Sequence, residues 1–244
     1  MSVKRFFALL LSVVLMLSVA GCAQADPEVD TELQRKLAFG AVLAQRNGMD
    51  FTTLGPMNDL DKLRHKEMLV TYWGILDYDT AVSTMERLLY DGMTASTDDF
   101  IGSDELMAIF SGRMEVTSEV KQYLAADLAD YQKAIDFLEE YGYEREKLGA
   151  MTTSIAWDLD RLVTVARWCV GVEYLTKEEA MPYIDEAVSK AVDSYESWED
   201  YFAGVVLGRC LTYDGDVEQN RQVADDLLKN KNSIYKKVDF KLAV

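Results

Sequence analysis

The sequence predicts an all-α protein, a single-domain bundle of roughly seven to nine helices. Apolar residues recur at intervals of three and four in one segment after another, which is the spacing that places side chains on one face of a helix. No segment sustains the alternation of apolar and polar residues that a half-buried strand requires. Only three prolines occur in 244 residues, so long helices can form without interruption.

The N-terminal segment has the layout of a secretory signal. Lys4 and Arg5 precede an apolar run over 6–20, which is shorter than the ~20 residues that a membrane-spanning helix needs. The run ends in Val19-Ala20-Gly21-Cys22, which resembles the lipobox of bacterial lipoproteins. The resemblance implies cleavage before Cys22, a diacylglycerol group on its sulfur and an extracytoplasmic protein tethered to a bacterial membrane. A secreted protein with a chance cysteine is the alternative.

The predicted organisation is a signal peptide over 1–21, an acylated cysteine with a polar tether over 22–30, and a helical domain over 31–244. The sequence carries a net charge of −17, and cleavage would remove two basic and no acidic side chains. So acidic a chain excludes nucleic acid as a partner, because the phosphates would be repelled. The partners that we expect are the lipid anchor and either a protein or a small anionic ligand.

Helical spacing and glycine stop signals delimit the first elements of the domain. One helix is predicted over 31–47. A second is predicted over 58–73, with Leu63, Val70 and Trp73 facing inward.

A third helix is capped by Asp77 or Asp79 and ended by Gly92. Its core stripe is Ala81, Val82, Met85, Leu88 and Leu89. A short helix over 103–110 precedes a long one over 118–141.

The second half of the domain begins with a central helix over 154–170. Thr176 and Glu179 form a capping box, so the next helix should start at Lys177, although Pro182 should kink it or shift its start. Ser197 caps a further helix to 211. A last helix is predicted over 217–229, and the tail from 235 is short and mixed.

The central helix carries a second face beside its core stripe. The residues of this face follow at spacings of four, three and four: Trp157, Arg161, Thr164 and Trp168. Arg161 can lie over the Trp157 ring and pair with Asp158 three residues earlier. The face forms either the floor of a pocket in which guanidinium groups bind an anion or a peptide carboxylate, or an ion-pair lattice that fixes helix packing.

Arg167 lies on a neighbouring face of the same helix, and Ser197-Trp198-Glu199 opens a later one. The predicted binding or structural cluster comprises Trp157, Asp158, Arg161, Arg167, Trp168, Ser197, Trp198 and Glu199.

Metal and triad chemistry has little support in the residue counts. His65 is the only histidine, which argues against a Ser-His-Asp triad and against a zinc site with several imidazoles. Apart from Cys22, the cysteines are Cys169 and Cys210. Both fall inside predicted helices, and we expect buried thiols, with a disulfide as the alternative. No metal and no cofactor is expected.

Six short motifs occur in order along the chain: Trp73-Gly74-Ile75, Ala156-Trp157-Asp158 with Arg161, Arg167-Trp168, Glu179-Ala180, Ser197-Trp198-Glu199 and Gly208-Arg209. In their order and spacing the chain resembles the bacterial domain-of-unknown-function family numbered 1266, over residues 73–209. The resemblance implies a helical domain for which no activity is established.

Three classes of function remain, and a membrane-anchored binding or protein-interaction module is the one that we expect. No catalytic motif is present, and aromatic residues with arginine are common at binding hot spots. The first alternative is a hydrolase that relies on carboxylates alone, with Asp158 beside Glu199 or Asp200. The second is a calcium-stabilised structural protein, because the acids of Asp214-Gly215-Asp216-Val217-Glu218 alternate as in a calcium loop.

Overall fold

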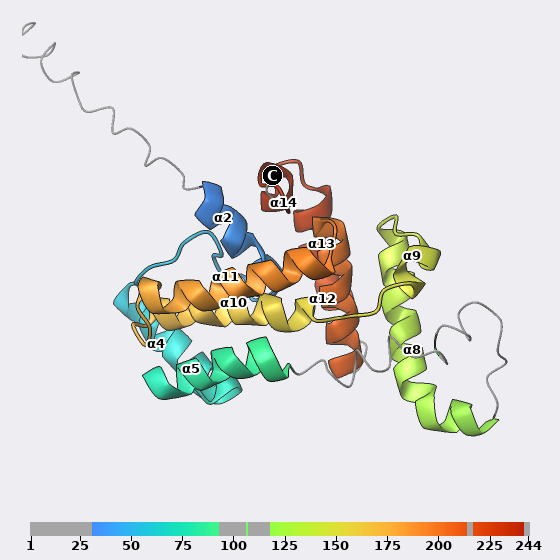
Figure 1. Cartoon of the computed structure of the whole chain (residues 1–244), viewed down its shortest axis with the longest axis horizontal. Coiled ribbons are helices and arrows are strands. Elements are labelled where there is room, and N and C mark those ends of the chain that lie inside the picture. Colours follow the sequence, from blue (N-terminus) through green and yellow to red (C-terminus); the bar gives the residue numbers. More distant parts are fainter. Residues whose placement is uncertain (1–30, 93–105, 107–117, 214–216, 242–244) are drawn as a thin grey trace, which may run out of the picture. The chain divides into compact units, whose positions relative to one another are not determined.

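The computed structural model describes residues 31–92, 106, 118–213 and 217–241, and of 118–126 the backbone only. Within these ranges the chain is helical, with turns between the helices and no strand, so the all-α prediction is confirmed (Figure 1). The residues from Thr31 to Val244 group into one compact unit. No helix in these ranges is both long and apolar enough to span a bilayer.

The helices follow one another in this order: α2 (Thr31–Ala38), α3 (Ala41–Arg46), α4 (Asp59–Met68), η1 (Leu69–Trp73), α5 (Tyr78–Glu86), η2 (Arg87–Asp91), α8 (Ser118–Glu140), α9 (Arg145–Gly149), α10 (Ala156–Gly171), α11 (Lys177–Ser194), α12 (Trp198–Thr212), η3 (Glu218–Asn220), α13 (Arg221–Ala224), η4 (Asp225–Lys229) and α14 (Ile234–Lys237). Three of the η elements are π-helical turns, and η3 is a 3-10 turn.

The helix α10 is buried on every side. All 16 of its residues are buried, although a surface helix would bury only one stripe. Its neighbours α3, α5, η2, α11 and α12 pack against it, and Figure 1 shows α11 running alongside it. Its burial extends to four charged residues, Asp158, Asp160, Arg161 and Arg167. Charges inside a fold need partners, so these residues organise their surroundings.

Three predicted helix starts are confirmed by their caps. The side chains of Asp77, Thr176 and Ser197 each accept a hydrogen bond from the backbone N–H three residues later, at 3.0, 3.2 and 3.0 Å. Thr176 and Glu179 complete the capping box. The helix α11 starts at Lys177 and continues through Pro182, so the shift in its start that we considered does not occur.

The helix predicted over 31–47 is two helices, because the chain breaks at Gly40 between α2 and α3. A Cβ on Gly40 would lie 2.8 Å from Thr164 Oγ1 and 2.9 Å from a methyl group of Val163. Only glycine allows this corner to approach α10 so closely. The Thr164 hydroxyl also donates a 2.7 Å hydrogen bond to the Gly40 carbonyl. A contact with a distant helix therefore overrides the local helical pattern.

Two residues predicted to face inward from 58–73 do not. Leu63 is 67% exposed and Val70 is 44% exposed, so that prediction is wrong. The helix α4 contributes no buried residue, and the π-helical turn η1 follows it at Leu69, which is fully buried. A π turn holds more residues than an α turn, so it rotates the later side chains away from the register that the sequence suggested.

The C-terminal part also differs from its prediction. The single helix predicted over 217–229 is the succession of η3, α13 and η4, and α14 lies in the tail predicted as mixed. The helix α9 was not predicted. The predicted helix over 103–110 lies outside the described residues except for Leu106, which is helical and buried. The acidic loop at Asp214 and Asp216 also lies outside them.

Candidate functional site

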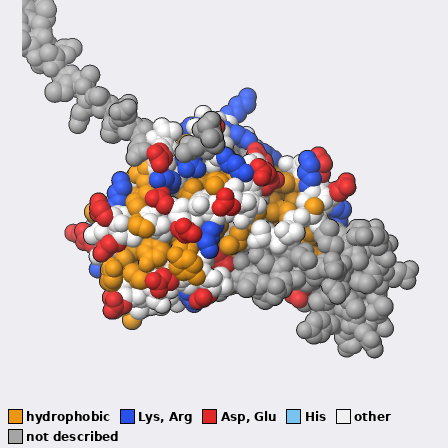
Figure 2. Space-filling view, in the orientation of Figure 1, with side chains coloured by type: hydrophobic (Ala, Val, Ile, Leu, Met, Phe, Trp, Pro, Cys, Tyr) orange, Lys and Arg blue, Asp and Glu red, His pale blue; other side chains and the backbone are white. Residues whose placement is uncertain are grey.

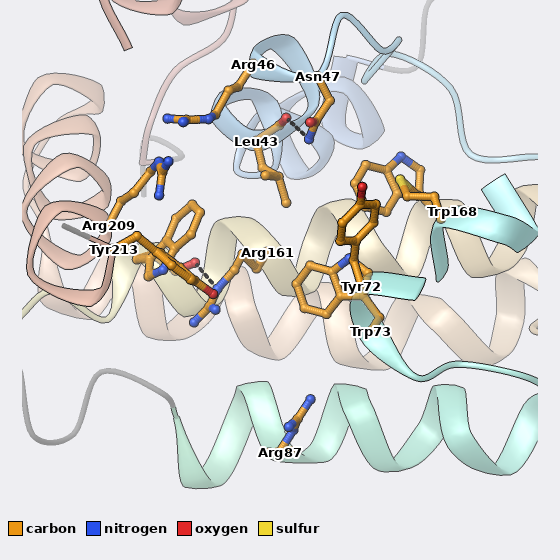
Figure 3. Close-up of a pocket in the computed structure, with 12 residues that line it drawn as sticks. Leu43, Arg46, Asn47, Tyr72, Trp73, Arg87, Arg161, Trp168, Arg209 and Tyr213 are labelled. Carbon is orange, nitrogen blue, oxygen red and sulfur yellow. Dashed lines mark hydrogen bonds between the residues drawn. The ribbon is translucent and has the colours of Figure 1, made fainter. Parts of the chain in front are cut away.

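A cavity of about 710 Å³ lies between α3, α10, α12 and the turns η1 and η2 (Figure 3). Its walls come from segments far apart in the sequence. The residues that line it are Leu43, Arg46, Asn47, Met68, Tyr72, Trp73, Arg87, Trp157, Arg161, Trp168, Arg209 and Tyr213. None of these described lining residues is acidic, although Asp and Glu outnumber Lys and Arg by 42 to 25 in the chain. We call this cavity the arginine cavity.

Two of its four arginines have no carboxylate partner among the described residues. Arg87 is exposed and forms no ion pair within the part of the chain that the structure describes. Arg209 places its guanidinium 5.8 Å from the centre of the Trp157 ring and 5.3 Å from that of Tyr213. Its Nε is buried and has no hydrogen-bond partner in those residues. Aromatic faces attract this charge, but they do not neutralise it.

The other two arginines are held in place by polar contacts. Arg46 donates a 2.8 Å hydrogen bond to Asn220 and another to Gln219, both uncharged. Arg161 pairs with Asp158 and lies 4.6 Å from the centre of the Trp157 ring, as the sequence predicts for both contacts. Burial lowers the pKa of Arg161, against the charge of Asp158, which raises it.

Aromatic side chains form the rest of the wall. In Figure 3, Arg161, Arg209 and Tyr213 gather at one end of the view, and Tyr72, Trp73 and Trp168 at the other. The indole N–H groups of Trp157 and Trp168 are buried and have no acceptor among the described residues. A buried donor without a partner costs about 1–3 kcal/mol, so an acceptor arriving in the cavity would be favoured.

Asp160 of α10 holds α3, which forms one wall of the arginine cavity, in place. Its carboxyl oxygens accept hydrogen bonds from the backbone N–H groups of Val42 at 3.0 Å and Leu43 at 2.9 Å, in the first turn of α3. These donors have no partner inside their own helix. The contact orients α3, which carries Arg46 over the cavity. Burial raises the pKa of Asp160 to about 8, although these two hydrogen bonds and Arg161 lower it.

The structure divides the predicted cluster. Trp157, Arg161 and Trp168 line the arginine cavity, and Asp158 is fully buried beside Arg161. Arg167 lines a different cavity.

The Ser197-Trp198-Glu199 motif belongs to the packing of the C-terminal tail. Ser197 caps α12. The Trp198 ring stacks 4.4 Å from Tyr235, and its indole N–H donates a 2.9 Å hydrogen bond to the Val238 carbonyl. Glu199 forms an ion pair of 2.9 Å with Lys236. These three residues are not part of the lining of the arginine cavity.

Several lining residues were missed from the sequence. Trp73 and Arg209 stand in the motifs of the family resemblance, so that signal pointed to them. Arg46, Arg87 and Tyr213 had no such signal, because each comes from a different element and only the tertiary fold brings them together.

The described residues form neither a metal-binding cluster nor a disulfide. No group of three or more His, Cys, Asp and Glu side chains is arranged there to hold a metal ion. Cys169 and Cys210 are both buried and form no disulfide with each other, as expected from their positions inside helices. Burial raises the pKa of Cys169 to about 12.

A family model described as "Protein of unknown function (DUF1266)" matches residues 68–240, well over half of the chain. Comparison with curated proteins and with solved structures gives no match. The matched region contains α5, α10, α11 and α12, and with them most of the arginine cavity.

Proposed function

The chain belongs to the DUF1266 family, whose description assigns no activity, and we therefore propose a function from the site itself. We propose that the protein binds an organic anion in the arginine cavity, and that it does so as a lipoprotein anchored through Cys22 outside the cytoplasm. The observation that carries the binding proposal is a lining that contains four arginines and, among its described residues, no acidic side chain.

The charge of the cavity contrasts with that of the molecule. Figure 2 shows Asp and Glu side chains spread over the face in view, in keeping with the net charge of −17. In such a chain an arginine can readily find a carboxylate, yet Arg87 and Arg209 have none among the described residues. A hydrogen bond from a guanidinium to an anion contributes about 1.5–3 kcal/mol, so a bound anion would stabilise this arrangement.

The aromatic wall suggests the rest of the ligand. Tyr72, Trp73 and Trp168 lie opposite Arg209 in the view of Figure 3, so an acidic group at the arginine end would leave an apolar or aromatic body against these rings. A volume of about 710 Å³ falls within the range of roughly 300–1,000 Å³ of small-molecule sites. The ligand class that we propose is an aromatic or apolar acid.

The test compares two fluorescent probes that share their rings, the anion anilinonaphthalene sulfonate and the neutral phenylnaphthylamine. We expect Arg209→Gln to weaken binding of the anion by about tenfold, which corresponds to the loss of one charge-assisted hydrogen bond. Binding of the neutral probe should change little. Dissociation constants from fluorescence titration at constant ionic strength give both values.

The matched control is Arg145→Gln. Arg145 is exposed, pairs with Glu139 and Asp136, and is not part of the lining of the arginine cavity. This substitution removes the same charge from the molecule and should leave the affinity for the anion unchanged. Equal affinities of Arg209→Gln and of the original chain for the anionic probe would refute the binding proposal.

A further inference from the structure

We propose that a second cavity, on another side of α10, binds a small monocarboxylate through Arg167. This cavity has a volume of about 530 Å³ and is formed by the segment 48–58, the start of α4 and α10. Its charged and polar lining includes Asp50, Thr53, Asp61, Arg64, His65 and Arg167. Arg167 is not part of the lining of the arginine cavity, so the proposal does not rest on the one above.

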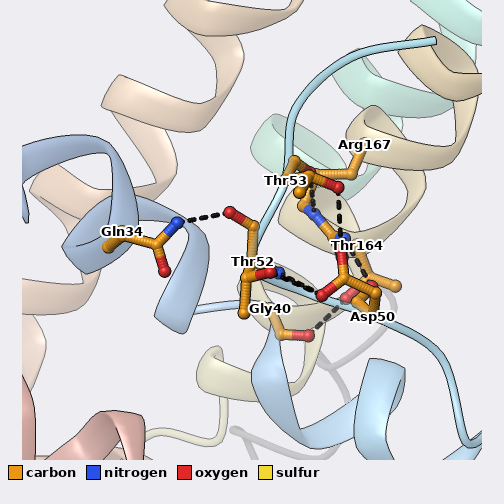
Figure 4. Close-up of polar contacts among 7 residues, drawn as sticks. All are labelled: Gln34, Gly40, Asp50, Thr52, Thr53, Thr164 and Arg167. Carbon is orange, nitrogen blue, oxygen red and sulfur yellow. Dashed lines mark hydrogen bonds and ion pairs between the residues drawn. The ribbon is translucent and has the colours of Figure 1, made fainter. Parts of the chain in front are cut away.

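Arg167 is 4% exposed and only partly satisfied. Its Nε donates a 3.0 Å hydrogen bond to the Thr53 carbonyl, and its Nη2 donates to the Asp50 carbonyl (Figure 4). These two contacts hold the segment 48–58 against α10. Its Nη1 is buried and has no partner among the described residues. Buried donors are nearly always paired in folded proteins, so this nitrogen calls for an acceptor.

The charge of Arg167 is also incompletely balanced. Its nearest carboxylate is that of Asp50, at 3.7 Å from Nη2, and this carboxylate already accepts hydrogen bonds of 2.6 and 2.7 Å from Thr52 and Thr53. Burial lowers the pKa of Arg167 to about 10, against the charge of Asp50. The cavity therefore keeps a buried cation that one more anionic group would stabilise.

Two further side chains complete the site. Arg64 is exposed, and its only ion pair among the described residues is a distant one of 3.9 Å with Asp61. The His65 ring nitrogen Nδ1 donates a hydrogen bond of 2.8 Å to the Asp61 carbonyl, since a carbonyl oxygen can only accept. This contact holds the ring at the wall of the cavity, where its protons can report on a bound ligand. The edge contact of the ring with Trp168, at 6.0 Å between centres, holds its orientation.

The balance of charge selects the ligand. Arg64 and Arg167 line the cavity together with Asp50 and Asp61, so the two positive charges face two negative ones. A dianion such as phosphate would meet both carboxylates, whereas a single carboxylate can accept a hydrogen bond from Nη1 of Arg167 with less repulsion. A small monocarboxylate is therefore the class that the cavity favours.

The test follows the imidazole proton signals of His65 by NMR, and since His65 is the only histidine, no assignment is needed. The intact protein is titrated with sodium propionate, and separately with inorganic phosphate, at fixed pH and ionic strength. We expect a shift that saturates with propionate and stays linear and small with phosphate. A linear response to propionate overturns the site, and saturation by phosphate at lower concentration overturns the carboxylate assignment.

Substitutions then assign the response to the two arginines. Arg167→Lys keeps the positive charge but removes the guanidinium group and its Nη1 donor, so saturation by propionate should disappear. Arg64→Gln removes an exposed charge and leaves the contacts of Arg167 intact. It should weaken propionate binding about threefold. This variant tests the site even if Arg167→Lys fails to fold. Unchanged affinity in Arg64→Gln overturns the proposal. Arg209→Gln should leave this titration unaltered, which separates it from that of the arginine cavity.

Discussion

Asp160 shows how one buried carboxyl group determines the position of another element. It accepts hydrogen bonds from the backbone N–H groups of Val42 and Leu43, and so places α3 over the arginine cavity. Within α10, Asp160 shares a face with Arg167, which follows it by seven residues. The structure gives it backbone donors from a segment more than a hundred residues away, which no pattern within α10 can indicate.

The raised pKa of Asp160 predicts a pH dependence of stability. With a pKa of about 8, the Asp160 carboxyl group stays protonated in the folded chain up to about that pH, whereas its ordinary pKa is 3.8. The stabilisation is fully present below the ordinary value and is lost as the pH rises through about 8. In denaturant titrations between pH 5 and 8, the free energy of unfolding should fall relative to that of Asp160→Asn, by at most about 1.4 kcal/mol per pH unit.

Asp136→Asn is the control for the Asp160 experiment, because it makes the same chemical substitution at an exposed side chain. A constant difference between the original chain and Asp160→Asn over this range would mean that Asp160 does not change its protonation between the folded and unfolded states there.

Local contacts of the site could be predicted from the sequence, and long-range ones could not. The pairing of Arg161 with Asp158 and its stacking on Trp157 follow from spacings of three and four on one helix, and both are present. Arg46 and Arg87 reach the same cavity from other elements. Tryptophan is common at binding hot spots, but the Trp198 ring packs inside the fold against other aromatic rings, among them Tyr235 and Phe240 of the tail.

At the scale of elements, helix starts were predicted correctly where the capping side chain bonds a backbone N–H only three residues later. The prediction of one helix over 31–47 failed at Gly40, where the contacts that decide the conformation lie outside the segment. The break at Gly40 depends on Thr164 and Val163 of α10. The apolar spacing of 31–47 continues across the break, so periodicity alone predicts one helix.

The corner at Gly40 provides a test of this packing. Gly40→Ala should destabilise the fold by about 1–3 kcal/mol, because the new methyl group would overlap the Thr164 side chain and approach its backbone nitrogen at 3.0 Å. Gly55→Ala is the matched control, since its Cβ would meet nothing within 4 Å. Chemical denaturation of both variants measures the difference. Equal stability of the two would show that α3 can move away from α10 at little cost.

At the scale of the whole molecule, the anchor is the prediction that most affects where the protein acts. Cys22→Ser should abolish incorporation of labelled palmitate by bacteria that express the full chain, because it removes the sulfur on which the proposal places the diacylglycerol. Ala23→Ser, one residue later, should keep the label. Labelling of Cys22→Ser to the level of the original chain would exclude lipidation at this cysteine.

The complete burial of α10 has a consequence for hydrogen exchange. A helix covered on every side exposes its amides only when the whole fold opens, so the exchange of α10 amides should report the global free energy of unfolding. Both cavities are built on this helix. A ligand of either one would therefore slow exchange along all of α10, by a factor of one plus the ratio of ligand concentration to dissociation constant.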